Sequence, residues 1–266
     1  MDIERRLSFG SVAELYDSSR PSYPDALVDD ALAYAPARDD GPVRVVEVGA
    51  GTGKATVLFA ARGASLLAIE PDPEMAAIAR RNTEAYAMVD VLGTEFESWD
   101  VGEERFELLI CAQAWHWISP GVRMSKAHEA LVDRGAMALF WNRPIWESCE
   151  LADALRAAYA DTVPEFGEMP GPMHPSHTDP LSSWGAYGED LDIAHGFESE
   201  PVRVYHWLSE YTSGEYVRLL QTHSDHIVLP EAQRAALFEA IQAVINAAGG
   251  TIGLTHRTHL WLARRA

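Results

Sequence analysis

The clearest pattern in the chain is a short apolar run at 43–48 that leads into alternating glycines and then into a second apolar stretch at 54–61. The β-branched residues of 43–48 are typical of a buried parallel strand, and the second stretch is typical of a helix with an apolar face. Gly49, Gly51 and Gly53 lie between them. A glycine-rich turn of this kind lets a ligand lie on bare backbone near the positive end of a helix.

Strand-like and helix-like patterns alternate along most of the chain, which predicts a doubly wound α/β sheet. Further strands are expected at 65–70, 88–93, 106–112, 135–144, 201–207 and 253–262. Helices are expected at 25–32, 74–87, 126–132, 150–159, 213–223 and 230–248. Residues 146–200 break the alternation and are rich in proline, so we expect an insertion that closes over a substrate.

Three ligand classes compete for the glycine turn. A P-loop requires Gly-x-x-x-x-Gly-Lys-Ser/Thr, but Val48 replaces its first glycine and Ala55 replaces its hydroxyl residue. A dinucleotide fingerprint requires a third glycine at the position of Lys54. The remaining pattern at 47–53, Glu-x-Gly-x-Gly-x-Gly, resembles the first motif of class I S-adenosylmethionine-dependent methyltransferases.

This resemblance implies S-adenosylmethionine as the cofactor and a Rossmann-like doubly wound sheet of seven strands with an antiparallel last strand. The loop residues expected to contact the cofactor are Glu47, Gly49, Ala50, Gly51, Thr52 and Gly53. We interpret the whole chain as one methyltransferase domain. Its expected parts are an N-terminal helical lid (1–40), a cofactor-binding core (41–145), a helical and loop insertion after strand five (146–200) and C-terminal strands and helices (201–266).

A second cofactor contact is expected at the end of the second predicted strand. Glu70 stands there, and an acid at this edge can accept two hydrogen bonds from a ribose diol. Pro71 and Met75 are further candidates, with ordinary core packing as the alternative for Met75. Asp72 is expected to cap the next helix, with Pro73 at its first position.

The segment 13–24, Ala-x-x-Tyr-x-x-x-Arg-Pro-x-Tyr-Pro, resembles a bacterial and fungal branch of small-molecule methyltransferases of type 11 that includes enzymes similar to trans-aconitate methyltransferase. The resemblance implies that Tyr16 and Arg20 face the methionine end of the cofactor and that Tyr23 faces the lid, as a candidate substrate contact. The alternative is an amphipathic cap in which Arg20 pairs with an acid. By the same resemblance, the adenine contacts are expected among Thr94, Glu95 and Phe96, and further cofactor contacts at Gln113 and Ala114.

The sequence Trp115-His116-Trp117 follows the fourth predicted strand, where the substrate and the methyl donor should meet. Aromatic rings can face a sulfonium cation or a planar substrate, and histidine titrates near neutral pH. His116 is therefore the candidate general base, and Trp115, Trp117 and Arg143 are candidate substrate contacts. The alternative is that both tryptophans belong to the core and that His116 bridges polar groups.

Composition limits the partners. The chain has 266 residues, a formal net charge of -19 and two cysteines. An acidic surface disfavours nucleic acid and anionic lipid, and two cysteines provide no disulfide framework. No apolar segment reaches the ~20 residues of a membrane span, and no signal peptide is recognised at the start. We expect a cytoplasmic protein with a small-molecule substrate, no nucleic acid or membrane partner, and a homodimer as an open alternative.

The expected reaction is methyl transfer to a small acceptor through an oxygen, nitrogen or carbon nucleophile of carboxylate or natural-product type. A nicotinamide-dependent oxidoreductase is disfavoured by Lys54 and by the lack of a Tyr-x-x-x-Lys set. A non-catalytic S-adenosylmethionine-binding protein stays open. His174, His177 and Asp179 have the residue types of a metal site, but flanking prolines favour a solvated loop, so no metal is expected.

Overall fold

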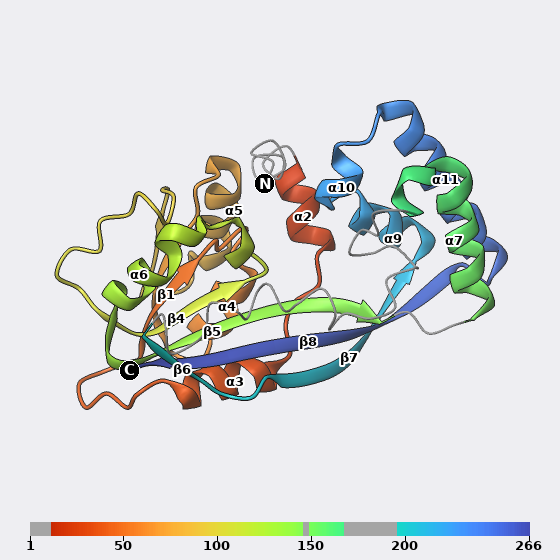
Figure 1. Cartoon of the computed structure of the whole chain (residues 1–266). Coiled ribbons are helices and arrows are strands. Elements are labelled where there is room, and N and C mark those ends of the chain that lie inside the picture. The colour runs from red at the N-terminus through yellow and green to blue at the C-terminus, as the bar shows by residue number, and fades with distance from the viewer. Residues whose placement is uncertain (1–11, 146–148, 168–195) are drawn as a thin grey trace.

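A mixed β-sheet organises the protein (Figure 1). The computed structural model describes residues 12–145, 149–167 and 196–266, and within them eight strands form one sheet in the order β3-β2-β1-β4-β5-β8-β6, with β7 also paired to β8. The strands are β1 (Arg44–Val48), β2 (Ser65–Ile69), β3 (Val89–Leu92), β4 (Phe106–Ala112), β5 (Leu131–Ile145), β6 (Phe197–Ser199), β7 (Arg203–Thr212) and β8 (Thr251–Arg265).

The first five strands are parallel, and β8 is antiparallel to β5. The order reverses between β1 and β4, which is the point of such a sheet where ligands bind. This confirms the predicted doubly wound sheet with an antiparallel last strand. The strand predicted at 201–207 is found as β7, which runs on to Thr212, and the short strand β6 was not predicted. Both pair with the 15-residue β8, at successive parts of its length. Pro201 lies between them and lacks the amide donor that a continuous strand would need.

Helices cover both faces of the sheet (Figure 1). They are α2 (Ala13–Ser19), α3 (Asp25–Tyr34), α4 (Lys54–Ala60), α5 (Pro73–Thr83), α6 (Pro120–Ala130), α7 (Glu150–Thr162), α9 (Ser213–Leu220), α10 (Ser224–Ile227) and α11 (Glu231–Ala247), with 3₁₀ turns η2 (Trp115–Trp117) and η3 (Pro164–Gly167). Helix α6 begins at Pro120, six residues before the predicted helix, because Ser119 and Pro120 form an ordinary helix start. No helix in the described part of the chain is both long and apolar enough to span a membrane.

Buried side chains form one apolar layer on each face of the sheet and a separate cluster beyond its edge. One layer packs α3 and α4 on the sheet, and the other packs α6 and Trp115 on it. The third cluster joins α7, α9 and α11 to the far end of β8. Figure 1 accordingly shows these three helices as a second group, held out from the sheet core by the long strands β5, β7 and β8.

Candidate cofactor and acceptor site

The glycine turn is held over the ends of β1 and β2 by backbone hydrogen bonds. The amides of Gly49 and Ala50 both donate to the carbonyl of Ile69, at 2.9 and 3.1 Å. Gly53 takes a left-handed conformation with φ of 83° and caps α4. The turn therefore lies at the carboxyl edge of the sheet, where the sequence predicted a ligand.

Two of the three glycines are required by close packing. A Cβ added to Gly49, whose φ is 70°, would lie 2.5 Å from the Cβ of Ala114. A Cβ on Gly53 would lie 3.3 Å from the Cα of Ala79 in α5. Gly51 also has a positive φ, but nothing lies within 4 Å of the added atom, so the turn is open above this residue.

We expect Gly49→Ala to destabilise the protein by about 2–3 kcal/mol, because a left-handed alanine is strained and its methyl group overlaps Ala114. Gly63→Ala is the matched control, since Gly63 has a φ of 83° and open space around it. It should lose only about 1 kcal/mol. Urea unfolding of both variants measures the difference. Equal losses in the two variants would contradict the steric argument.

Glu70 is built into the turn. Its carboxylate accepts hydrogen bonds from the amide of Gly51 at 2.8 Å and from the amide of Asp72 at 2.9 Å. Asp72 in turn accepts from the amides of Glu74 and Met75, each at 3.0 Å, and Pro73 is the first residue of α5. The predicted cap is confirmed, and Glu70 stands at the predicted edge of the sheet.

A pocket opens beside this turn. The predicted cofactor residues that line it are Tyr16, Arg20, Glu47, Gly49, Ala50, Gly51, Thr52 and Gln113. The predicted substrate residue Tyr23 also lines it, together with Pro21, Lys54, Ala55 and Ala112, which sequence reasoning did not assign. The N-terminal segment, the glycine turn and the end of β4 thus meet at one place.

Glu47 is a buried acid at this pocket. It is 1% exposed and accepts a hydrogen bond from the hydroxyl of Thr56 at 2.6 Å. No described lysine or arginine within residues 12–145, 149–167 and 196–266 forms an ion pair with it. Burial raises the pKa of Glu47 to about 8, and the charge of Glu70 adds to this effect while the Thr56 bond opposes it. A carboxyl group in this state favours a ligand that brings a positive charge.

Two further features fit a polar ligand. The hydroxyl of Thr52 is buried and has no hydrogen-bond partner among the described residues, which is unusual for a buried polar group. Gln113 has a φ of 62° at the end of β4, and non-glycine residues held in this region cluster at functional sites. Both residues line the pocket. A ligand with hydroxyl, amino and carboxylate groups would satisfy such a lining.

Helix α2 and the residues after it close one side of the pocket. The amide of Asn82 donates to Asp17 and to the carbonyl of Thr52, each at 2.9 Å, and so ties α2 to the glycine turn. Arg20 lies over the ring of Tyr16, 5.0 Å from its centroid. It donates to the hydroxyl and the carbonyl of Thr222, at 2.8 and 2.7 Å. Among the described residues, Arg20 therefore contacts Thr222 and Tyr16 and forms no ion pair with an acid.

Tyr23 packs edge-on against Phe140, with 4.9 Å between the ring centroids. Burial raises the pKa of its phenol well above the usual value, and the neighbouring Tyr16 and Glu47 add to the effect. Tyr23 thus lines the same pocket as the predicted cofactor residues.

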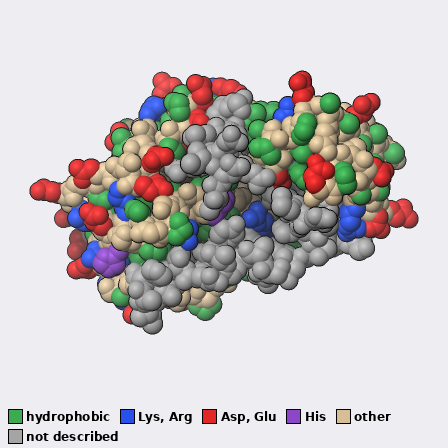
Figure 2. All heavy atoms as spheres, turned by 45° about the horizontal axis from the view of Figure 1, so that its top comes forward, with side chains coloured by type: hydrophobic (Ala, Val, Ile, Leu, Met, Phe, Trp, Pro, Cys, Tyr) green, Lys and Arg blue, Asp and Glu red, His purple; other side chains and the backbone are tan. Residues whose placement is uncertain are grey.

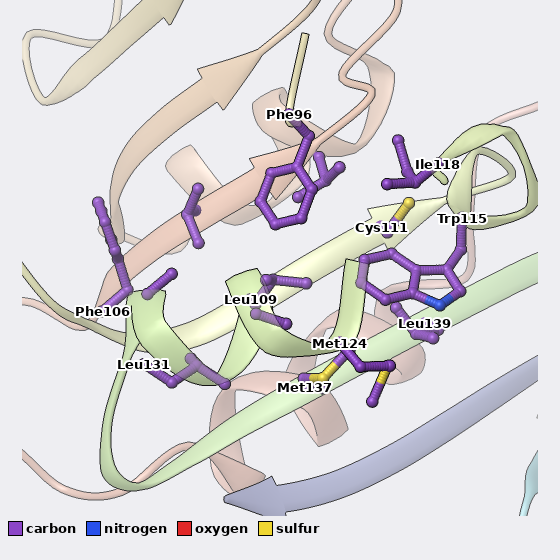
Figure 3. Packing of buried hydrophobic residues seen from close by; sticks show 14 of the residues in the cluster. Phe96, Phe106, Leu109, Cys111, Trp115, Ile118, Met124, Leu131, Met137 and Leu139 are labelled. Atoms are coloured by element: carbon purple, nitrogen blue, oxygen red, sulfur yellow. The ribbon is translucent and has the colours of Figure 1, made fainter. Parts of the chain in front are cut away.

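The residues after β4 divide between core and site. Trp115 is fully buried, 6.2 Å from Phe96 between ring centroids, and packs with Met124 and Leu139 (Figure 3). Its side chain packs as part of the core, which is the alternative that the sequence left open beside a substrate contact. Ala114 meets Gly49 and does not line the pocket.

His116 and Trp117 remain at the surface of this core. Their rings lie 4.7 Å apart between centroids, and both are half-buried. Burial, and then the charges of Arg143 and Arg123, lower the pKa of His116 to about 4. His116 is therefore neutral at pH 7. Arg143 belongs to β5, and it lies near enough to His116 to affect the pKa of His116 electrostatically.

The predicted adenine contacts are the least supported part of the site. The side chains of Phe96 and Met75 are buried at 1% and 3% exposure in two core clusters, and neither lines the pocket. For Met75 this is the ordinary core packing that the sequence left open. Thr94, Glu95 and Pro71 are partly or fully exposed and do not line the pocket. The apolar residues predicted near the adenine ring pack instead into the protein core.

Lys54 is the informative residue that sequence reasoning missed. Lys54 excludes other kinds of glycine loop, and it also lines the pocket at the first turn of α4. Burial lowers its pKa, and the charge of Asp17 opposes this. Its position directly after the third glycine was the available signal. The candidate metal set at His174, His177 and Asp179 lies outside the described residues, and the described part of the chain holds no group of three metal-ligating side chains.

Comparison with known proteins agrees with this geometry. A family model described as a methyltransferase domain matches residues 45–135, which include the glycine turn, Glu70 and the end of β4. An uncharacterised methyltransferase of Mycobacterium tuberculosis is 37% identical over 136 residues, covering 51% of this chain and 52% of that protein. A probable S-adenosylmethionine-dependent methyltransferase of Saccharomyces cerevisiae is 26% identical, covering 54% of this chain and 50% of that protein. The matched part of this chain thus spans about half the length of each of these relatives.

The fold is shared more widely. A putative type II methyltransferase from Anaeromyxobacter dehalogenans superposes with a TM-score of 0.66 at 17% identity, covering 92% of this chain and 97% of that one. An S-adenosylmethionine-dependent methyltransferase from Thiobacillus denitrificans, solved with S-adenosylhomocysteine, gives a TM-score of 0.50 at 15% identity, covering 97% and 99%. Residues 45–135 thus match the methyltransferase-domain family, and the chain as a whole shares its fold with these solved structures.

Proposed function

We propose that the protein transfers a methyl group from S-adenosylmethionine to a small-molecule acceptor. The observation that carries the proposal is the pocket at the point where the strand order reverses, lined by Glu47, Thr52 and Gln113 beside the glycine turn. A small acceptor suits this arrangement, because α2 and the segment around Arg20 cover one side of the site.

In this proposal the chain's own residues bind and orient the cofactor. Glu70 accepts hydrogen bonds from the ribose hydroxyls, since its carboxylate is already aligned at the sheet edge by Gly51 and Asp72. Glu47 neutralises the ammonium group of the methionine part. Thr52 and Gln113 contact the polar groups near this ammonium group, and Arg20 binds the carboxylate of the methionine part.

When bound, S-adenosylmethionine supplies an activated methyl group on a sulfonium. Much of the protein's effect then comes from alignment of the acceptor and exclusion of water. His116 is neutral at pH 7, and in this proposal it accepts a proton or a hydrogen bond from an acceptor that needs one. Full turnover of His116→Ala at saturating acceptor would remove this role.

Calorimetric titration of the purified protein with S-adenosylmethionine, S-adenosylhomocysteine and NAD tests the proposal. We expect micromolar binding of both sulfur compounds and none of NAD. Binding of NAD alone would overturn the proposal and favour a nicotinamide-dependent reaction.

The pKa of Glu47 predicts a pH dependence of cofactor binding. At pH 7 a carboxyl with a pKa of about 8 is mostly protonated, and an arriving ammonium lowers that pKa. Binding should therefore release close to one proton at pH 7, and affinity should rise with pH until it levels off above about 8. Titrations in buffers of different ionisation enthalpy measure the released proton. Glu47→Gln is the control, since it should show no such proton release.

The same pKa predicts the stability of the ligand-free protein. Because the folded pKa of Glu47 is raised, its stabilising contribution is complete below the unfolded value of 4.5 and is lost as the pH rises to about 8. Glu47→Gln should flatten this part of the stability curve. A wild-type curve unchanged by the substitution would show that Glu47 is ionised in the free protein.

A further inference from the structure

A series of hydrogen bonds runs across the long strands, from the edge of the sheet to the N-terminal segment. The indole of Trp207, on β7, donates to the hydroxyl of Thr258, on β8, at 2.8 Å. That hydroxyl donates to the side-chain oxygen of Asn142, on β5, at 2.6 Å. The side-chain amide of Asn142 then donates to the backbone carbonyl of Ser22 at 2.8 Å. We call these four residues the cross-strand network.

The network has a single direction. An indole N–H can only donate and a backbone carbonyl can only accept, whereas a hydroxyl and an amide side chain can do both. Trp207 at one end and Ser22 at the other therefore fix the orientations of the two residues between them. These two, Thr258 and Asn142, are buried at 0% and 6% exposure. The loss of one partner would therefore leave a buried polar group unpaired and the amide of Asn142 without a fixed orientation.

The strand that carries Asn142 also holds a second wall of the cofactor pocket. The backbone carbonyl of Asn142 accepts a hydrogen bond from the side-chain amide of Gln113 at 3.4 Å, and the carbonyl of Phe140 accepts from the backbone amide of Gln113 at 2.9 Å. The φ of 62° at Gln113 is a conformation that persists only when the surrounding structure holds it. Gln113 lines the pocket, as do the residues on both sides of Ser22. Asn142 thus contacts two walls of the pocket.

The segment 20–24 is the wall that most needs such support. Figure 1 shows α2 above the long strands and α3 below them, so this segment crosses the plane of the sheet. Arg20 fastens it to Thr222, between α9 and α10, and Asn142 fastens it to β5. Figure 2 shows a hollow between the sheet core and the group formed by α7, α9 and α11, with blue and purple side chains in it. A segment that links these two groups is packed on fewer sides than the core, so its hydrogen bonds set more of its position.

We propose that Asn142 is a positioning residue for the cofactor. Asn142 does not line the pocket, but it sets where the segment around Ser22 lies relative to Gln113, and Thr258 and Trp207 orient its amide. This inference rests on the proposed function, in which residues of both walls contact the methionine part of the cofactor. Walls that are held in place before binding reduce the ordering that the cofactor must impose, and the network therefore raises the affinity.

The test measures the affinity of the full chain for S-adenosylhomocysteine by calorimetry and its stability by urea unfolding. Thr258→Val keeps the shape of the side chain but removes the hydroxyl, and it should weaken the binding about 3–10-fold, which corresponds to one lost hydrogen bond. Thr258→Ser keeps the hydroxyl and should retain the wild-type affinity. Trp207→Phe removes the first donor and keeps an aromatic ring over His256, on which Trp207 stacks at 4.3 Å between centroids. It should weaken the binding about threefold.

Ser213→Ala is the matched control. Ser213 is also buried, at 7% exposure, and its hydroxyl donates to the side-chain oxygen of Asn246 at 2.7 Å. It lies at the start of α9 and does not line the pocket. Ser213→Ala should lose stability as Thr258→Val does, but it should keep the wild-type affinity for S-adenosylhomocysteine. The comparison separates a positioning effect from a general loss of stability.

The outcomes also separate this inference from the function on which it rests. A wild-type protein that does not bind S-adenosylhomocysteine would contradict the proposed function itself. If the wild type binds it and neither Thr258→Val nor Trp207→Phe changes the affinity, Asn142 does not position the cofactor site. The same conclusion follows if Ser213→Ala weakens the binding as much as Thr258→Val does. If Thr258→Val does not fold, the affinities of Trp207→Phe and Thr258→Ser decide the question.

Discussion

Glu70→Ala is expected to weaken S-adenosylhomocysteine binding by about 10²–10⁴-fold. Two hydrogen bonds from ribose hydroxyls to a carboxylate are each worth about 1.5–3 kcal/mol, or about 3–6 kcal/mol together. The substitution also removes the acceptor that holds the amides of Gly51 and Asp72. The glycine turn would then lose its fixed position over β2. Calorimetric titration of the variant against the wild type measures the loss.

Two variants separate these contributions. Glu74→Ala removes an exposed acid four residues away, in the first turn of α5, and should leave the affinity within about twofold. Glu70→Gln keeps the side-chain length but has one acceptor oxygen and no charge. It should fall between the wild type and Glu70→Ala. An affinity of Glu70→Ala within threefold of the wild type would exclude Glu70 from the cofactor site.

Trp115→Ala is expected to destabilise the protein by about 3–5 kcal/mol. Trp115 is fully buried against Phe96, Met124 and Leu139, so its removal leaves a large cavity in the layer between α6 and the sheet (Figure 3). Its backbone carbonyl also accepts a hydrogen bond from Arg123 at 3.3 Å, which the substitution keeps. Denaturant unfolding measures the change in the free energy of unfolding.

Trp117→Ala provides the comparison, because Trp117 is two residues away but only half-buried. The Trp117→Ala variant should lose about 1 kcal/mol of unfolding free energy. Its effect on the rate of methyl transfer should be larger than its effect on stability if Trp117 faces the acceptor. The opposite result, a stable Trp115→Ala protein without activity, would restore Trp115 as a substrate wall. The pair therefore decides between the two interpretations that the sequence left open.

Features determined by neighbouring residues were predictable from the sequence. The strand at 44–48, the glycine turn and the helix after it are contiguous, so hydrophobic periodicity and the need for positive φ located them correctly. The cap formed by Asp72 and Pro73 is equally local. Glu70 was placed because the second strand of a doubly wound sheet always ends beside the first turn.

Strand boundaries beyond the core were less predictable. The strand predicted at 201–207 is found as β7 and runs on to Thr212, whereas β6 was not predicted; the 15-residue β8 pairs with each along a different part of its length. The pattern of hydrophobic residues within a strand does not indicate how long the strand that pairs with it is. The choice between core and site was likewise undecided for Trp115, Phe96 and Met75, since an apolar side chain has the same pattern in either place.

Only the tertiary structure decided the contacts between distant segments. The sequence does not indicate which residue Arg20 contacts. The fold brings Arg20 against Thr222, which is 202 positions away along the chain. The side chains that β5, β7 and β8 present on one face depend on the registers of these strands, and a shift of one residue would turn each of them to the other face. The sequence by itself therefore determined the cofactor turn, which is local, whereas strand register and packing determined the contacts between distant segments.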